Sequence, residues 1–204
     1  MIALIDYKAG NLTSVRKAFA ALGAELFTPE RPGELDSADA IVVPGVGHFG
    51  ATRALGPDWI EAILGRVGEL RPLLGICLGM QWLFEGSEEA PDLPGLGLLS
   101  GQCYKLRGAP HGVNEAVKIP HVGWNSLEIQ REGSIVDGVA NGAQVYFTHS
   151  FVAPVTGDTV AITTHGEPFA SIVQRGHVAG VQFHPEKSGD VGLQVLRNFL
   201  SMVG

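Results

Sequence analysis

The sequence has few of the features that mark several large classes of protein. It holds only 2 cysteines in 204 residues, too few for a disulfide framework. No apolar run approaches the roughly 18 residues that a membrane-spanning helix needs. The opening stretch, MIALIDYKAGN, also lacks the basic segment of a secretory signal. We therefore expect a soluble protein of the reducing cytoplasm that does not bind a membrane.

Basic residues are scarce as well. The chain has 14 Lys and Arg against 21 Asp and Glu, a net charge of −7. Proteins that bind nucleic acid concentrate Lys and Arg on one surface, so no nucleic-acid partner is expected. The chain contains no Walker A loop and neither of the metal-site spacings CxxC and HxxxH. We expect no cofactor and no metal.

Strand and helix patterns alternate through the first half of the chain. Apolar runs predict strands at 2–6, 24–28, 38–45 and 72–76. Helical spacing of the apolar residues predicts helices at 11–22, 58–70 and from residue 78 onwards. This alternation is typical of a parallel sheet with helices on both faces.

The second half is rich in strand patterns. They cover 102–107, 124–130, 144–151, 159–165, 169–174 and 178–184, with a hairpin turn near Arg175 and Gly176, before a final helix at 189–203. The predicted fold is α/β, with an open, mixed and largely parallel sheet flanked by helices. No clean linker divides the chain, so we expect a single domain over 1–204.

One cysteine lies at an unusual corner, GICLG, residues 75–79. The pattern has the form of a nucleophile elbow, in which a reactive side chain stands on a tight turn between strand and helix. Backbone N–H groups at the start of a helix favour a thiolate there. The alternative is that Cys77 is a small buried residue in a Gly-rich turn, which is the usual environment of a cysteine. Cys103, on an expected strand, is best explained by packing alone.

A nucleophile needs a base, and His184 is the best placed of the seven histidines. It ends the apolar strand VAGVQF, at the same edge of the sheet as the elbow, and precedes Pro185 and Glu186. A carboxylate two residues on can orient the imidazole, the third role in a catalytic triad. Taken alone, Glu186 fits a solvated loop carboxylate equally well. The elbow and the His-Pro-Glu run together favour the triad.

A tetrahedral intermediate also needs donors for its oxyanion. One is the N–H of Leu78, which follows the nucleophile, and a second is expected from PGVG, residues 44–47, at the end of another strand. An ordinary Gly-rich turn explains that tetrapeptide as well.

The motifs PGVG, GICLGMQ and FHPE, in this order on an α/β sheet, together resemble the class I (triad) glutamine amidotransferases. Within that class, the stretches DYKAGNLTSV, IPHVGWN, YFTHSF and GVQFHPEKSG are similar to those of the glutaminase subunits of imidazole glycerol phosphate synthases. The matched stretches run from residue 6 to residue 189. One departure is Lys8-Ala9, where relatives often carry a Gly-rich dipeptide, and it affects no expected catalytic role.

The resemblance implies a role for each matched residue. Cys77 would be the nucleophile, His184 the general base and acid, and Glu186 its orienting carboxylate. The backbone N–H groups of Leu78 and Val46 would hold the oxyanion. Further roles are expected for residues that bind glutamine, namely Gln81, Gly45, Thr148, His149 and Ser150, and for two at a partner interface, Asn11 and Lys187.

The implied activity is hydrolysis of L-glutamine to glutamate and ammonia. The ammonia would pass to a separate (β/α)8 cyclase subunit in a heterodimer, giving imidazole glycerol phosphate and an aminoimidazole carboxamide ribotide in histidine biosynthesis. The chain alone is expected to be a poor glutaminase, because rotation of one peptide near Val46 would remove an oxyanion donor. In the resting protein we expect the Val46 N–H to point away from the site above Cys77.

Two other enzyme functions remain open: a glutaminase serving another synthase, and a cysteine hydrolase or peptidase of the same elbow architecture. Gln81 and the HPEK and GNLTSV stretches weigh against a peptidase. A catalytically inactive regulatory relative would be expected to lack a triad residue, and all three are present.

Overall fold

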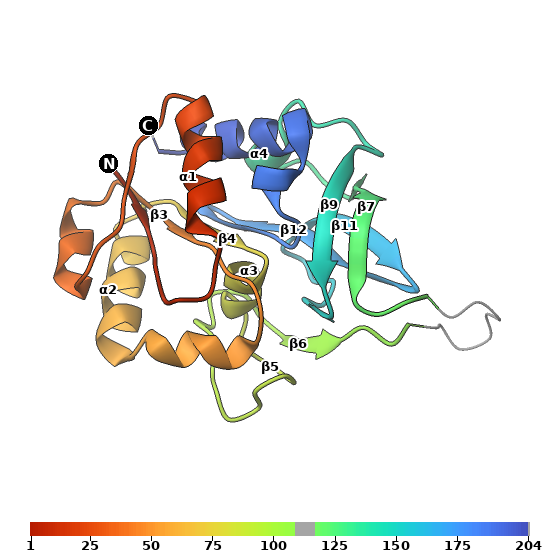
Figure 1. Ribbon diagram of the computed structural model, residues 1–204, viewed down its shortest axis with the longest axis horizontal. Coiled ribbons are helices and arrows are strands. Elements are labelled where there is room, and N and C mark those ends of the chain that lie inside the picture. Colours follow the sequence, from red (N-terminus) through yellow and green to blue (C-terminus); the bar gives the residue numbers. More distant parts are fainter. Residues whose placement is uncertain (109–116, 204) are drawn as a thin grey trace.

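The computed structural model describes residues 1–108 and 117–203. An 8-stranded sheet runs through it in the order β2-β1-β3-β4-β13-β12-β11-β8 (Figure 1). Its strands, in chain order, are β1 (Ile2–Leu4), β2 (Leu26–Phe27), β3 (Ala40–Val43), β4 (Leu73–Ile76), β8 (Glu128–Ile129), β11 (Thr159–His165), β12 (Glu167–Arg175) and β13 (Val178–Val181). Pairing is parallel from β2 to β13 and antiparallel from β13 to β8.

Two smaller sheets lie beside the large one. One has the order β10-β6-β5 and the other pairs β7 with β9. Their strands are β5 (Gly86–Ser87), β6 (Gln102–Lys105), β7 (His121–Ser126), β9 (Gln144–His149) and β10 (Phe151–Val152). The expected α/β architecture, with a mixed sheet and a strand-rich second half, is confirmed.

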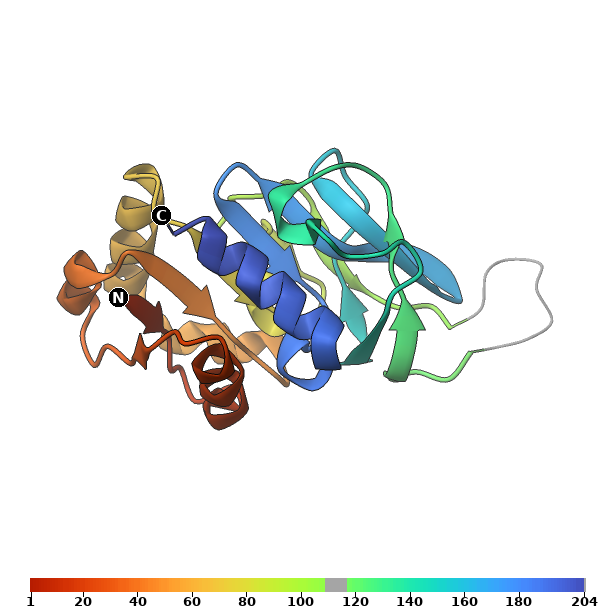
Figure 2. The same cartoon turned by 90° about the horizontal axis from the view of Figure 1, so that it is seen from above.

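The α-helices are α1 (Leu12–Ala21), α2 (Pro57–Gly68), α3 (Leu78–Trp82) and α4 (Gly189–Ser201). Short 3-10 helices are η1 (Pro32–Ser37), η2 (Phe49–Ala54), η3 (Ser134–Val136) and η4 (Pro185–Lys187). Helices α1 and α4 cover one face of the large sheet and α2 and α3 the other (Figure 1). Figure 2 shows α4, the dark blue helix, lying across the sheet with α1 beside it. No helix in the described part of the chain is long and apolar enough to cross a membrane.

Each face of the sheet has its own apolar core, and β1 together with Ile5, the residue that follows it, shows how the two cores are divided. Ile2 and Leu4 pack in the core under α1 and α4, whereas Ala3 and Ile5 pack in the core with α2 and α3. This follows from the period of two in a strand. Because both faces are covered, the central strands are apolar throughout, which is why their sequences read as short continuous apolar runs.

Three parallel strands end at the same edge of the sheet. Val43 of β3 pairs with Gly75 of β4, and Gly75 pairs with Gly180 of β13. The segments that follow these strands are PGVG, the Cys77 turn and the run containing His184. Ligands bind at this edge in open α/β folds, so the topology gathers the expected site residues.

Two predicted strands are interrupted. The predicted strand 144–151 breaks at Ser150, because β9 pairs with β7 while β10 pairs with β6 in another sheet. The predicted strand 124–130 breaks at Leu127 for the same reason, since β8 joins the large sheet beside β11. The helix predicted from residue 78 ends at Trp82. The hairpin turn near Arg175 and Gly176 is confirmed between β12 and β13.

Candidate active site

Cys77 stands on a strained turn between β4 and α3. Its φ of 54° and ψ of −108° are uncommon for a residue with a side chain. The turn is held by its backbone, because the Cys77 N–H donates to the Val181 carbonyl (2.7 Å) and the Cys77 carbonyl accepts from the Gln81 N–H (3.1 Å). Glycine is required at position 79, where a Cβ would clash with the Val43 carbonyl oxygen. The elbow form predicted from GICLG is confirmed.

His184 and Glu186 form a buried pair. The Nδ1 atom of His184 lies 2.9 Å from Oε1 of Glu186, and the two side chains are only 2% and 3% exposed. The backbone of His184 is fixed too, since its N–H donates to the Tyr146 carbonyl (2.9 Å) and its carbonyl accepts from the Ser188 hydroxyl (2.7 Å). A carboxylate at Nδ1 keeps a proton on that nitrogen, which leaves Nε2 as the atom that can take or give a proton.

The Nε2 atom of His184 is buried and has no hydrogen-bond partner within the described residues. Burial by itself lowers the pKa of this imidazole, but interactions with Cys77 and then with Glu186 outweigh burial and raise the pKa to about 10. The imidazole therefore favours its charged form next to the Cys77 thiol. A thiol beside a base that is oriented by a carboxylate is the arrangement of an activated cysteine nucleophile.

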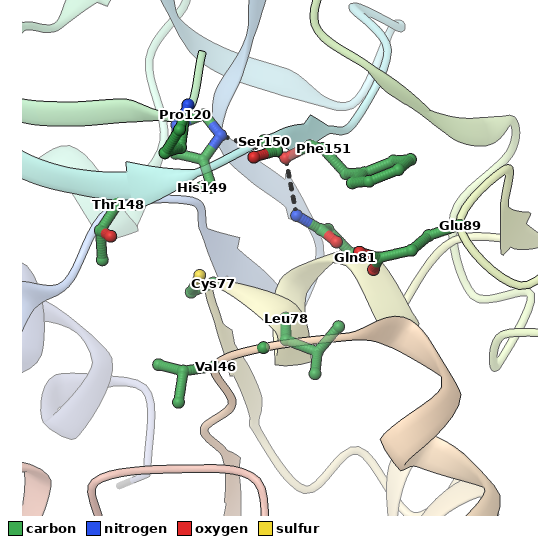
Figure 3. Close-up of a pocket in the computed structure, with 11 residues that line it drawn as sticks. Val46, Cys77, Leu78, Gln81, Glu89, Pro120, Thr148, His149, Ser150 and Phe151 are labelled. Atoms are coloured by element: carbon green, nitrogen blue, oxygen red, sulfur yellow. Dashed lines mark hydrogen bonds between the residues drawn. The ribbon is translucent and has the colours of Figure 1, made fainter.

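A pocket of about 360 Å³ opens above Cys77 (Figure 3). Its lining includes seven residues expected from the sequence: Val46, Cys77, Leu78, Gln81, Thr148, His149 and Ser150. His184 and Glu186 do not line it and lie buried instead. Gly45 is also absent from the lining: it is buried, and a Cβ there would clash with the hydroxyl of Tyr7.

Neither expected oxyanion donor is free in this conformation. The Val46 N–H donates to the Ala9 carbonyl (3.0 Å), and the Leu78 N–H donates to the Gly45 carbonyl (3.3 Å). One peptide, Gly45–Val46, therefore turns its carbonyl towards the donor on α3 and its N–H towards the loop before α1. This agrees with the resting orientation expected for the Val46 N–H.

Gln81 has a defined orientation on the pocket wall. Its Nε2 donates to the Phe151 carbonyl (2.9 Å) and to Oε1 of Gln182 (3.1 Å), which uses both of its hydrogens (Figure 3). The amide oxygen is thus the group that Gln81 offers to a ligand. Gln182 continues the network by placing its Nε2 3.6 Å from the sulfur of Cys77.

Sequence reasoning missed three residues of the pocket wall, Glu89, Pro120 and Phe151. Glu89 brings a carboxylate into the pocket, and its Oε2 accepts from the Phe49 N–H (2.7 Å). The signal for Glu89 was the acidic pair in GSEE, shortly after the elbow helix. The buried amide of Gln182 was missed as well, although it lies two residues before His184.

The two residues expected at a partner interface are both exposed. Asn11 caps α1, where its side chain accepts from the Ser14 N–H (3.2 Å), so it has a structural role as well. The Lys187 ammonium lies 5.8 Å from the centre of the Tyr146 ring, and that ring lies 6.1 Å from the ring of Trp124. Trp124 and Val122 are each 57% exposed. Lys187, Tyr146 and Trp124 thus lie next to one another, and Val122 shares the exposed face of β7 with Trp124. This surface mixes apolar groups and a positive charge.

Comparisons with known proteins bear on the whole chain. The family model "Glutamine amidotransferase class-I" matches residues 3–203. A curated relative from Bacillus cereus (strain B4264), "Imidazole glycerol phosphate synthase subunit HisH", is 42% identical over 206 residues, covering 100% of this chain and 95% of the relative. The protein with the same description from Methanothermobacter thermautotrophicus is 41% identical over 204 residues, covering 100% and 99%.

Solved structures share the fold. A crystal structure described as a glutamine amidotransferase superposes with a TM-score of 0.76 at 21% identity and covers 100% of both chains. The structure of PurLQS from Thermotoga maritima gives a TM-score of 0.76 at 17% identity, covering 100% of this chain and 98% of that one.

Proposed function

This chain belongs to the class I glutamine amidotransferases, and from that premise we propose that it is the glutaminase subunit of an imidazole glycerol phosphate synthase. The observation that carries the proposal is the Cys77 elbow, which opens into a pocket and has the buried His184–Glu186 pair beside it. The relatives described as HisH subunits match over the full chain and support the choice of synthase.

The proposed reaction begins with the sulfur of Cys77 attacking the side-chain amide carbon of L-glutamine. His184 Nε2 gives a proton to the departing ammonia, so that a glutamyl thioester remains on Cys77. Water then attacks the thioester, His184 accepts a proton from that water, and glutamate leaves with the sulfur free again. Glu186 holds the imidazole in one tautomer through both steps and stabilises its charged form.

The pocket lining supports a way of holding the substrate. The carboxylate of Glu89 suits the α-ammonium group of an amino acid, and the Gln81 oxygen suits an N–H donor of the ligand. The backbone of Thr148–Ser150 would hold the α-carboxylate, and the Val46 and Leu78 N–H groups would hold the oxyanion. Gly45, which does not line the pocket, would act by shaping the Val46 peptide rather than by touching glutamine.

The proposed partner is a cyclase subunit of (β/α)8 form that receives the ammonia and makes imidazole glycerol phosphate and the carboxamide ribotide. The names of the relatives support a partner subunit, since each is described as a subunit of a synthase. Asn11, Lys187 and the exposed Val122 and Trp124 are the proposed contact residues. An apolar surface with a charged rim is typical of protein interfaces.

A control step follows from the resting geometry. Rotation of the Gly45–Val46 peptide would release the Leu78 N–H from the Gly45 carbonyl and bring the Val46 N–H towards the oxyanion position. One oxyanion donor is worth ~10²–10³-fold in turnover. We propose that the partner, when it holds its own ligand, favours the rotated peptide and so switches on hydrolysis.

The decisive experiment mixes the purified chain with the cyclase and its nucleotide substrate and measures glutamine-dependent cyclisation. We expect product only when chain, cyclase and glutamine are all present. Cyclisation with added ammonia but never with glutamine would refute the assignment to this synthase. If the chain hydrolyses glutamine but has no effect on the cyclase, a role as the glutaminase of another synthase is favoured. If it cleaves peptides, a cysteine hydrolase or peptidase is favoured.

A further inference from the structure

A chain of hydrogen-bonded side chains runs from β7 to the pocket wall, and the proposed mechanism does not use it. Asn125 Nδ2 lies 3.2 Å from His121 Nε2, and His121 Nδ1 lies 3.0 Å from His149 Nε2. His149 Nδ1 lies 3.1 Å from the Phe151 carbonyl oxygen. The backbone supports this arrangement, because His121 and His149 are directly paired residues of β7 and β9.

The position of every proton in this row of hydrogen bonds is set by the groups at its two ends. The Phe151 carbonyl can only accept, so His149 carries its proton on Nδ1 and presents a bare Nε2. That nitrogen must receive its hydrogen bond from Nδ1–H of His121, which leaves His121 Nε2 as an acceptor. Asn125 supplies the donor there, and its amide is itself oriented, because Nδ2 donates to the Thr164 carbonyl (3.0 Å) and Oδ1 accepts from the Ser126 N–H (2.8 Å).

The ring of His121 is also fixed from above and below. It stacks on the Phe147 ring with centroids 4.7 Å apart and on the His165 ring with centroids 4.0 Å apart. Hydrogen bonds at both nitrogens fix rotation within the ring plane, and the two stacked rings fix the plane. His121 is buried, being 3% exposed. A histidine held in this way has one available tautomer and one orientation.

The row of hydrogen-bonded side chains ends at the Phe151 carbonyl oxygen, the atom that orients the Gln81 amide. The Phe151 carbonyl accepts both from His149 and from Gln81 Nε2. Gln81 in turn donates to Gln182, whose amide reaches the sulfur of Cys77. Fixing the Phe151 carbonyl therefore fixes which atom Gln81 shows to the pocket, and holds the Ser150–Phe151 segment against the ligand space.

We propose that His121 is a positioning residue for glutamine: through His149 and the Phe151 carbonyl it pre-orients the Gln81 side of the pocket. Its neighbours along β7, Val122 and Trp124, point outward and are exposed, whereas His121 and Asn125 point inward. The strand that carries the proposed contact surface thus also carries the positioning residue. This inference rests on the proposed glutaminase activity.

Two substitutions of His121 separate positioning from simple packing. His121→Phe keeps a flat ring for stacking but removes the donor to His149. The melting temperature should fall moderately, because the buried Nε2 of His149 is left unpaired, and the KM for glutamine should rise about 5- to 10-fold. His121→Asn places an amide N–H near the position of Nδ1 but removes the stacking ring. Its melting temperature should fall while its KM stays within about 3-fold of wild type.

Both variants are measured with and without the cyclase, and kcat is expected to change less than KM because Cys77 and His184 are untouched. His177→Gln is the matched control, since His177 is bonded to the Val67 carbonyl and lies outside the pocket. Equal KM values in wild type and His121→Phe would overturn the proposal and leave the glutaminase assignment standing. A wild-type chain that hydrolyses no glutamine even with the cyclase would overturn the assignment, and the inference with it.

Nitrogen-15 NMR of the histidine rings tests the proton order without any assay of activity. Wild-type His121 and His149 should both show the Nδ1–H tautomer and should not titrate between pH 5 and pH 8. Burial first, and then the nearby imidazoles, lower the pKa of His121 to about 4 and that of His149 to about 3. The titratable groups facing them are His165 and His184. In His121→Phe, His149 should keep its Nδ1–H, because the Phe151 carbonyl can only accept, while its Nε2 resonance should shift on losing the donor. An Nε2–H signal on wild-type His149 would overturn the proposal.

Discussion

The N–H of Val46 donates to the Ala9 carbonyl, 3.0 Å away, and this bond ties the loop above the nucleophile to the segment that leads into α1. Asn11, the residue that caps α1, lies two positions after Ala9 in the sequence. A partner that contacts Asn11 therefore acts close to the acceptor that holds Val46 in its resting orientation.

The first prediction concerns this resting state. The chain alone should hydrolyse glutamine slowly, and the cyclase with its nucleotide ligand should raise turnover by at least ~10²–10³-fold, because one oxyanion donor is worth that much and the rotated peptide frees two. The measurement compares glutamate production by the chain alone, with cyclase, and with cyclase plus ligand. Full activity in the lone chain would rule out control by the Gly45–Val46 peptide.

Replacing the nucleophile should separate the two halves of the reaction. Cys77→Ala should abolish glutamine hydrolysis, because the sulfur makes the covalent bond to the substrate. The complex should still cyclise its substrate when ammonia is added, since added ammonia bypasses the glutaminase step. Hydrolysis near the wild-type rate in this variant would disprove the role of Cys77.

The base and its orienting carboxylate should differ in importance. His184→Ala should lower kcat/KM by ~10²–10⁴-fold, the usual contribution of a general acid–base group. Glu186→Gln should cost less, because it keeps a group at Nδ1 and acts only through the imidazole. Glutamine turnover of both variants, measured at saturating cyclase, checks the order. Small and equal losses in both would transfer the role of the base to another histidine.

Removal of the thiol should lower the pKa of His184. Interaction with Cys77 is the largest of the effects that raise this pKa, so Cys77→Ala leaves burial opposed mainly by Glu186. A raised pKa stabilises the fold fully below the ordinary value of 6.5, and that contribution is lost as the pH rises towards about 10. Wild type should therefore lose stability between pH 7 and pH 10 more steeply than the variant. NMR titration of His184 checks the direction, and an unchanged pKa would contradict it.

Charge reversal at the proposed interface should weaken assembly. Lys187→Glu should raise the Kd for the cyclase roughly tenfold, through loss of a charged contact at the rim. The melting temperature of the isolated chain should barely change, because Lys187 is exposed and contacts of exposed charges contribute about 1 kcal/mol or less. Arg31→Glu is the control, since Arg31 is exposed and its ion pair is with the nearby Glu34. Equal affinities of Lys187→Glu and wild type would remove Lys187 from the interface.

Local patterns predicted much of the fold. The strand at 159–165 has the predicted bounds, and the helices at 12–21 and 57–68 lie within two residues of their predicted ends. These elements have strong periodicity and clear end signals. The site at the edge of the sheet was also predictable, because the carboxyl ends of parallel strands lie at one edge of a sheet. Seven of the expected site residues line one pocket.

The features that the sequence analysis did not predict depend on contacts between segments that are distant in the sequence. The breaks at Leu127 and Ser150 interrupt patterns that continue unchanged through both residues, because the break reflects a change of partner strand. The His121–His149 contact needs the register of β7 against β9, which no local signal gives. Glu89 lies in a turn-rich segment whose path is set by its contacts, so an acidic pair in the sequence could not place it.

The glycine at position 79 has a consequence for mutational scanning. A methyl group there would clash with the Val43 carbonyl oxygen, and one at Gly45 would clash with the Tyr7 hydroxyl. In alanine scanning, a loss of activity is usually attributed to the side-chain atoms that the substitution removes. At these two glycines the substitution removes no side-chain carbon and adds one, so a loss of activity there reflects the clash. Both would score with the catalytic residues in a screen. A soluble-expression readout, scored beside activity, would separate variants that cannot form the turn from those that form it and lack the chemistry.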